Sequence, residues 1–135
     1  MLSEKLLTTV RKENEKFIAI DFDGVIHLYT TPFDGTDIIP DPPVEGALGA
    51  IKSLYSQGYK IVIFSARAKD NSAKAAIWSW LRKYGFIPYI SSVTNIKPTA
   101  KVIVDDKAIQ FRGDWFQTLK DINTFEPWQE NPALK

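Results

Sequence analysis

The sequence predicts an α/β fold, a Rossmann-like three-layer sandwich with a mostly parallel sheet and helices on both faces. Short apolar runs without polar alternation recur at 17–20, 60–65 and 101–104. Such runs are typical of strands that are buried on both faces of a parallel sheet. Segments with helical spacing of apolar residues lie between them, and this strand–helix alternation indicates the class.

In the N-terminal half, residues 3–15 are expected to form a polar helix before the first strand. Residues 27–43 are rich in proline and glycine, which predicts a loop with at most a short hairpin. The next helix is expected to begin near Pro43 and to stop at Gly58. Its apolar residues recur at helical spacing: Val44, Leu48, Ile51 and Tyr55.

The clearest helix is predicted over 70–84, with Trp80 in its apolar face and Gly85 at its end. A short third strand is expected within 86–93, and a fourth leads into Asp105. Residues 108–122 predict one short strand and a final helix, which Trp115 and Phe116 are expected to anchor. We interpret 1–125 as a single domain and 126–135 as a loose tail.

The length and composition of the chain exclude several classes of protein. The 135 residues suit one compact domain, and without cysteine there is no disulfide and no thiolate metal site. A net charge of +1 argues against binding to nucleic acid by bulk charge. No apolar run approaches the ~20 residues of a membrane helix, and the N-terminus lacks the pattern of a signal peptide. We therefore expect a cytoplasmic protein that is not bound to membranes.

Polar side chains follow three of the predicted strands. Asp21 and Asp23 follow the first, Ser65 the second, and Asp105 and Asp106 the last. Ligands of open α/β sheets bind outside the carboxyl ends of the strands. This convergence of polar groups predicts a functional site at that edge of the sheet.

The chemistry expected of this site is phosphoryl transfer. Asp21 and Asp23 are two residues apart on extended chain, so both carboxylates point to one side. Crowded carboxylates repel unless a cation intervenes, and Mg²⁺ prefers such oxygen ligands together with substrate phosphate. One carboxylate can then attack phosphorus while another acts as acid and base.

The motifs resemble those of the haloacid dehalogenase (HAD) superfamily of phosphatases. IAIDFDGV matches its first motif, IVIFS with Ser65 its second, Lys97 in NIKP its third, and VIVDD its fourth. The four motifs occur in the family's order over roughly residues 17–116. The resemblance implies a Rossmann-like fold and a Mg²⁺-dependent phosphomonoesterase.

The resemblance also implies roles for individual residues. Asp21 would be the nucleophile and a metal ligand, and Asp23 the acid/base with its backbone carbonyl on Mg²⁺. Asp105 and Asp106 would complete the metal site, while Ser65 and Lys97 would bind the transferring phosphoryl group. The expected substrate-binding set is Gly24, Ser65, Ala66, Arg67, Lys97 and His27. For Arg67 and His27, an ordinary structural role is an equal alternative.

Many family members carry a cap domain over the site. About 40 residues separate Asp23 from Ser65 and about 30 separate Ser65 from Lys97, and the predicted elements use both gaps. We therefore expect a capless enzyme with an open site. Water would be excluded from the open site by the 27–43 loop, by a second copy in a homo-oligomer, or by the substrate itself. The expected substrate is either a phosphorylated nucleotide or nucleic-acid end, or a small phosphometabolite.

Two alternatives remain. An EF-hand calcium loop is disfavoured because Val25 and Pro32 stand where oxygen ligands are needed. A non-catalytic phosphate-binding or phospho-relay module also uses an acidic pair, an acceptor Asp and a Lys. In the receiver family the acceptor follows the third strand, and the predicted third strand here, PYISSV, has no Asp.

Overall fold

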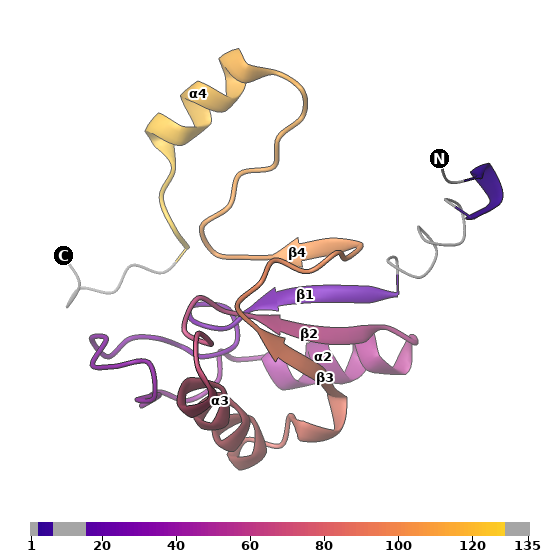
Figure 1. The fold of residues 1–135 in the computed structure, drawn as a ribbon. Coiled ribbons are helices and arrows are strands. Elements are labelled where there is room, and N and C mark those ends of the chain that lie inside the picture. Colours follow the sequence, from indigo (N-terminus) through magenta and orange to yellow (C-terminus); the bar gives the residue numbers. More distant parts are fainter. Residues whose placement is uncertain (1–2, 7–15, 129–135) are drawn as a thin grey trace.

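The computed structural model describes residues 3–6 and 16–128, and its centre is a parallel four-stranded sheet (Figure 1). The strands are ordered β3-β2-β1-β4. Their bounds are β1 Phe17–Asp21, β2 Lys60–Phe64, β3 Ile90–Thr94 and β4 Val102–Val104. The predicted α/β class with a parallel sheet is confirmed.

Within residues 16–128, three helices and one 3₁₀ turn accompany the sheet: α2 Ala47–Ser56, α3 Asn71–Lys83, η1 Ile87–Tyr89 and α4 Trp115–Thr124. Helix α2 begins later than Pro43 because Gly46 directly precedes it in a left-handed conformation, with φ 85°. The segment 105–114 contains no strand, contrary to the short strand expected there. Most of the helix expected over 3–15 lies outside the described residues.

Helix α3 follows the sequence prediction closely. The Asp70 side chain accepts a hydrogen bond from the Ala73 backbone N–H at 2.8 Å, which caps the first turn. Gly85, with φ 82°, lets the chain leave the last turn. The predicted apolar face is buried in the core, and Trp80 packs edge-on against Phe22.

Both α2 and α3 pack against one face of the sheet. Alternate residues of β1 and β2 point to this face and join Ile51 of α2 and Leu81 of α3 in the core: Ile18, Ile20, Ile61 and Ile63. Right-handed crossovers from β1 to β2 and from β2 to β3 place their helices on the same side. On the opposite face, Val62 and Thr94 border a hollow of about 350 Å³ below the loop 96–99.

Helix α4 stands apart from the sheet (Figure 1). Trp115 is 64% exposed and Phe116 is 86% exposed, so the expectation that they anchor this helix is wrong. The cause is the preceding segment 105–114, which has neither helix nor strand and carries α4 away from β4. Helical spacing of apolar residues thus predicted the helix but not its packing.

The strand register brings the acidic residues to one edge of the sheet. Asp21 pairs with Phe64, and Ile20 pairs with Val104, so Ser65 and Asp105 both follow beside Asp21. The carboxyl ends of β1, β2 and β4 therefore meet where the sequence predicts a site. No helix among the described residues is long and apolar enough to cross a membrane.

Candidate active site

Three carboxylates form the centre of the site. Asp21 ends β1, and Asp105 and Asp106 follow β4, and each offers an oxygen within 4.8 Å of the others. Asp105 is oriented by its own turn, because its Oδ1 accepts a hydrogen bond from the Lys107 backbone N–H at 2.9 Å. We call Asp21, Asp105 and Asp106 the acidic triad.

The acidic triad holds excess negative charge. Burial, a hydrogen bond with Asp106 and the charges of Asp105 and Asp106 raise the pKa of Asp21 to about 8. Burial and neighbouring Asp105 also raise the pKa of Asp106. These raised pKa values mean that, without a cation, the crowded carboxylates favour keeping a proton. An all-oxygen donor set with this unmet charge fits a hard divalent cation such as Mg²⁺.

The turn after β1 carries Gly24 to the triad. The Gly24 N–H donates to the His27 carbonyl at 2.8 Å, and its φ is +81°. A Cβ built on Gly24 would collide with Oδ2 of Asp106. Glycine is therefore required twice over, for its backbone angle and for the close approach of Asp106.

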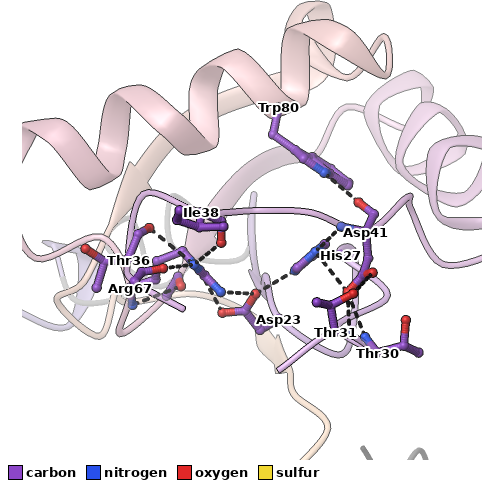
Figure 2. A network of polar contacts seen from close by, with 11 residues as sticks. Asp23, His27, Thr30, Thr31, Thr36, Ile38, Asp41, Arg67 and Trp80 are labelled. Atoms are coloured by element: carbon purple, nitrogen blue, oxygen red, sulfur yellow. Dashed lines mark hydrogen bonds and ion pairs between the residues drawn. The ribbon is translucent and has the colours of Figure 1, made fainter. Parts of the chain in front are cut away.

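Asp23 does not belong to the acidic triad, and Arg67 and His27 form a clamp around its carboxylate (Figure 2). Arg67 donates from Nε to Asp23 Oδ2 and from Nη2 to Oδ1, both at 3.0 Å. His27 Nδ1 lies 2.8 Å from the same Oδ1. Burial raises the pKa of Asp23, but hydrogen bonds from His27 and Arg67 outweigh it and hold that pKa below its usual range. Asp23 is therefore an ionised acceptor in this arrangement.

His27 is fully buried, and its tautomer follows from its partners. Its Nε2 accepts the backbone N–H of Asp41 at 3.1 Å, so the ring proton lies on Nδ1 and is donated to Asp23. The Asp41 carboxylate in turn accepts three hydrogen bonds from Thr30 and Thr31. The Asp41 carbonyl accepts the indole N–H of Trp80 at 2.9 Å, which ties this network to α3.

Arg67 ties the 27–43 loop to the same network. Its Nη1 donates to the carbonyls of Gly35, Thr36 and Ile38 at 3.0, 3.2 and 2.9 Å (Figure 2). The Arg67 side chain is only 2% exposed. Arg67 and His27 are thus occupied within the protein, and the geometry supports the structural alternative for both rather than direct contact with substrate.

The remaining predicted site residues divide into two groups. Ser65 is buried at the end of β2, where its Oγ accepts the Arg67 backbone N–H at 3.2 Å, and Ala66 is exposed beside it. Lys97 is exposed and lines the hollow below the loop 96–99. No ion pair joins Lys97 to Asp21 within the described residues, so the structure does not bring this lysine to the triad.

Sequence reasoning missed three residues around the site. Asp41 stands in a Pro-Asp-Pro stretch that indicates only a turn. Tyr29 has φ 57°, which is rare for a side chain of its size, and burial together with the charges of Asp23 and Asp106 raises its pKa. Trp128 donates its indole N–H to the Gly24 carbonyl at 2.9 Å. No local pattern announces such a contact across 104 residues.

Comparison with known proteins informs the fold alone. No protein-family model matches the chain, and no curated protein matches it. A solved structure described as a conserved protein from Bacteroides thetaiotaomicron is similar, with a TM-score of 0.50 and 21% identity. The similarity covers 79% of this chain and 88% of that one.

Proposed function

We propose that this protein is a Mg²⁺-dependent phosphomonoesterase of the HAD type that forms a phosphoaspartate on Asp21. One observation carries the proposal: the acidic triad unites Asp21 with Asp105 and Asp106 at the ends of adjacent parallel strands. The raised pKa of Asp21, about 8, marks a site whose charge calls for a cation.

In the proposed reaction, an Asp21 oxygen attacks phosphorus and the bond to the leaving alcohol breaks. Water then attacks the phosphorus of the phosphoaspartate, which releases inorganic phosphate and restores the Asp21 carboxylate. Asp21, Asp105 and Asp106 would hold Mg²⁺, which when bound supplies the positive charge that neutralises carboxylates and phosphoryl oxygens. Ser65 and the exposed Ala66 follow β2 and would bind the phosphoryl group.

The acid/base role of Asp23 needs a rearrangement. Its carboxylate accepts from both Arg67 and His27, and its lowered pKa keeps it ionised. To protonate a leaving alcohol, Asp23 must turn out of this clamp toward the triad and take up a proton. Substrates with good leaving groups need no such proton, so they test the nucleophile independently of Asp23.

The clamp also favours a second candidate function, a module that accepts a phosphoryl group and releases it slowly. If Asp23 stays with Arg67, water has no general base and the phosphoaspartate persists. Incubation of the protein with an excess of labelled phosphomonoester separates the two functions. A phosphatase releases inorganic phosphate repeatedly, whereas a phosphoacceptor retains about one label per chain.

The test of the proposed function is the hydrolysis of a generic aryl phosphate with Mg²⁺, by wild type and by Asp105→Asn. Loss of one ligand oxygen of the triad should weaken Mg²⁺ binding and shift the metal requirement to higher concentration. Lys107→Gln is the matched control, because Lys107 contacts Asp105 only through its backbone N–H. Undiminished activity of the wild type after thorough chelation of divalent metal would rule out the metal mechanism.

A further inference from the structure

Trp128 is hydrogen-bonded to Gly24, the glycine that lies against the acidic triad. Its indole N–H donates to the Gly24 carbonyl at 2.9 Å, and Gly24 is the residue against which Asp106 packs. The loose tail expected over 126–135 is described only as far as Trp128, and that residue is fixed at the site. The C-terminal segment therefore contributes an aromatic side chain to the surroundings of Asp21.

The orientation of Trp128 leaves its ring available. The N–H is its one hydrogen-bond donor, and Gly24 already accepts it. The residue is 61% exposed, and no aromatic ring of residues 3–6 and 16–128 packs against it. Trp115, by contrast, lies against Phe111 with the ring centres 5.1 Å apart. Trp128 therefore presents an exposed, apolar π surface beside Gly24.

Next to Trp128 the rim carries Asp105, Asp106 and the backbone around Gly24. The alcohol part of a phosphomonoester that extends from Asp21 over this rim would meet the Trp128 ring. A purely polar alcohol gains little from an indole face, whereas a planar aromatic group stacks on it favourably. The exposed face of one indole suits one base-sized group.

We propose that Trp128 forms a stacking subsite for the leaving group, and that the substrate is a phosphomonoester bearing a planar aromatic group, such as a nucleoside monophosphate. The proposal rests on the proposed function, because it places the phosphoryl group at Asp21. In the competing interpretation, Trp128 only fastens the C-terminal segment. That role would affect all substrates alike.

Two substrates that release the same kind of alcohol distinguish between these interpretations. Adenosine 5′-monophosphate and glycerol 3-phosphate both release a primary alcohol, and only the first carries a base. Trp128→Ala should lower kcat/KM for the nucleotide by about tenfold or more, mainly through KM, since stacked bases contribute on this scale. Its kcat/KM for glycerol 3-phosphate should stay within about twofold of wild type on the same reasoning.

Two further variants control for folding and for general surface effects. Trp128→Phe keeps a ring but loses the hydrogen bond to Gly24, so it should retain most of the preference for the nucleotide. Trp115→Ala removes an indole of similar exposure, 64%, on α4. This variant should leave kcat/KM unchanged for both substrates. An equal loss for both substrates in Trp128→Ala, or no loss for either, would overturn the stacking subsite.

A binding measurement distinguishes failure of this inference from failure of the proposed function. In the Asp21→Asn background with Mg²⁺, adenosine 5′-monophosphate should quench tryptophan fluorescence, and adding Trp128→Phe should remove most of the quenching. Quenching without turnover of any phosphate would contradict the phosphatase but support the subsite. Turnover of an aryl phosphate without Trp128-dependent quenching would contradict the subsite and leave the phosphatase standing.

Discussion

At the scale of single residues, the two carboxylates of the first motif have opposite environments. Asp21 lies among other carboxylates, and its pKa is raised to about 8. Asp23 accepts hydrogen bonds from Arg67 and His27, and these hold its pKa low despite its burial. Such separation of neighbouring pKa values is the feature that divides roles between two acids. Here it makes Asp23 the fixed anion until the clamp opens.

Arg67 should matter chiefly for stability. Replacement by Met leaves the Asp23 carboxylate and the carbonyls of Gly35, Thr36 and Ile38 without their guanidinium donors. Breaking a buried pair costs about 3–5 kcal/mol, and urea unfolding measures this loss of free energy. Arg112→Met is the control, because exposed Arg112 contacts only Gln110 and should cost less than about 0.5 kcal/mol. Equal stability of the two variants would contradict the clamp.

His27 should act through Asp23 rather than by contact with substrate. His27→Phe keeps a buried ring but removes the donor to Asp23 and the acceptor for Asp41. Since Asp23 matters most for poor leaving groups, kcat for an alkyl phosphate should change by at least about tenfold more than kcat for a nitrophenyl phosphate. Steady-state kinetics on the two substrates measures this ratio. Equal effects on both would mean that His27 supports the fold alone.

At the scale of elements, the turn after β1 determines the geometry of the triad. Gly24→Ala introduces a side chain at φ +81° and against the Asp106 carboxylate, so Asp106 must move. We expect a loss of stability of about 1–3 kcal/mol together with a weaker rise in Tm on addition of Mg²⁺. Thermal unfolding with and without Mg²⁺ measures both effects.

Gly49→Ala is the matched control for that substitution. Gly49 lies within α2, and a Cβ there meets open space. Alanine in a helix interior stabilises by roughly 0.5–1 kcal/mol relative to glycine. Gly49→Ala should therefore raise Tm and leave the Mg²⁺ response unchanged. If Gly24→Ala behaved in the same way, the close approach of Asp106 to Gly24 would be disproved.

At the scale of the whole molecule, the charge of the triad couples folding to pH. The pKa of Asp21 is about 8 in the folded protein, against the ordinary value of 3.8 that applies to an aspartate in the unfolded chain. Between these values the folded state keeps a proton that the unfolded chain has released, so stability declines as pH rises. Asp23 and Asp41 have lowered pKa values, so their contributions are already complete above pH 5.

The metal-free protein should therefore have a lower Tm at pH 8 than at pH 5. Asp21→Asn should reduce this difference, because it removes the most strongly shifted carboxyl. Mg²⁺ should raise Tm more at pH 8 than at pH 5, since it binds the ionised triad. Thermal melts in chelator and in Mg²⁺ test this, and a metal-free Tm that rises toward pH 8 would contradict the assigned electrostatics.

The fold and the triad were predictable from sequence because both depend on local patterns. Apolar runs that end in Asp21, Ser65 and Asp105 predict strands, and parallel strands bring such ends to one edge. The partners of Asp23 were not predictable. Its carboxylate binds both His27, four residues away in the sequence, and Arg67, which is 44 residues away and reaches it only through the fold. Likewise Trp128 and Asp41 reach the site through tertiary contacts, and the exposure of α4 depends on packing rather than on helical spacing.

The central claim is that Asp21 is a metal-assisted nucleophile, and one comparison tests it most directly. Wild type and Asp21→Asn are incubated with a nitrophenyl phosphate and Mg²⁺, and release of nitrophenol is followed, with the folded state of both proteins verified by thermal melts. The account predicts turnover by wild type, none by Asp21→Asn, and loss of wild-type turnover in chelator. Near-normal turnover by folded Asp21→Asn would contradict it.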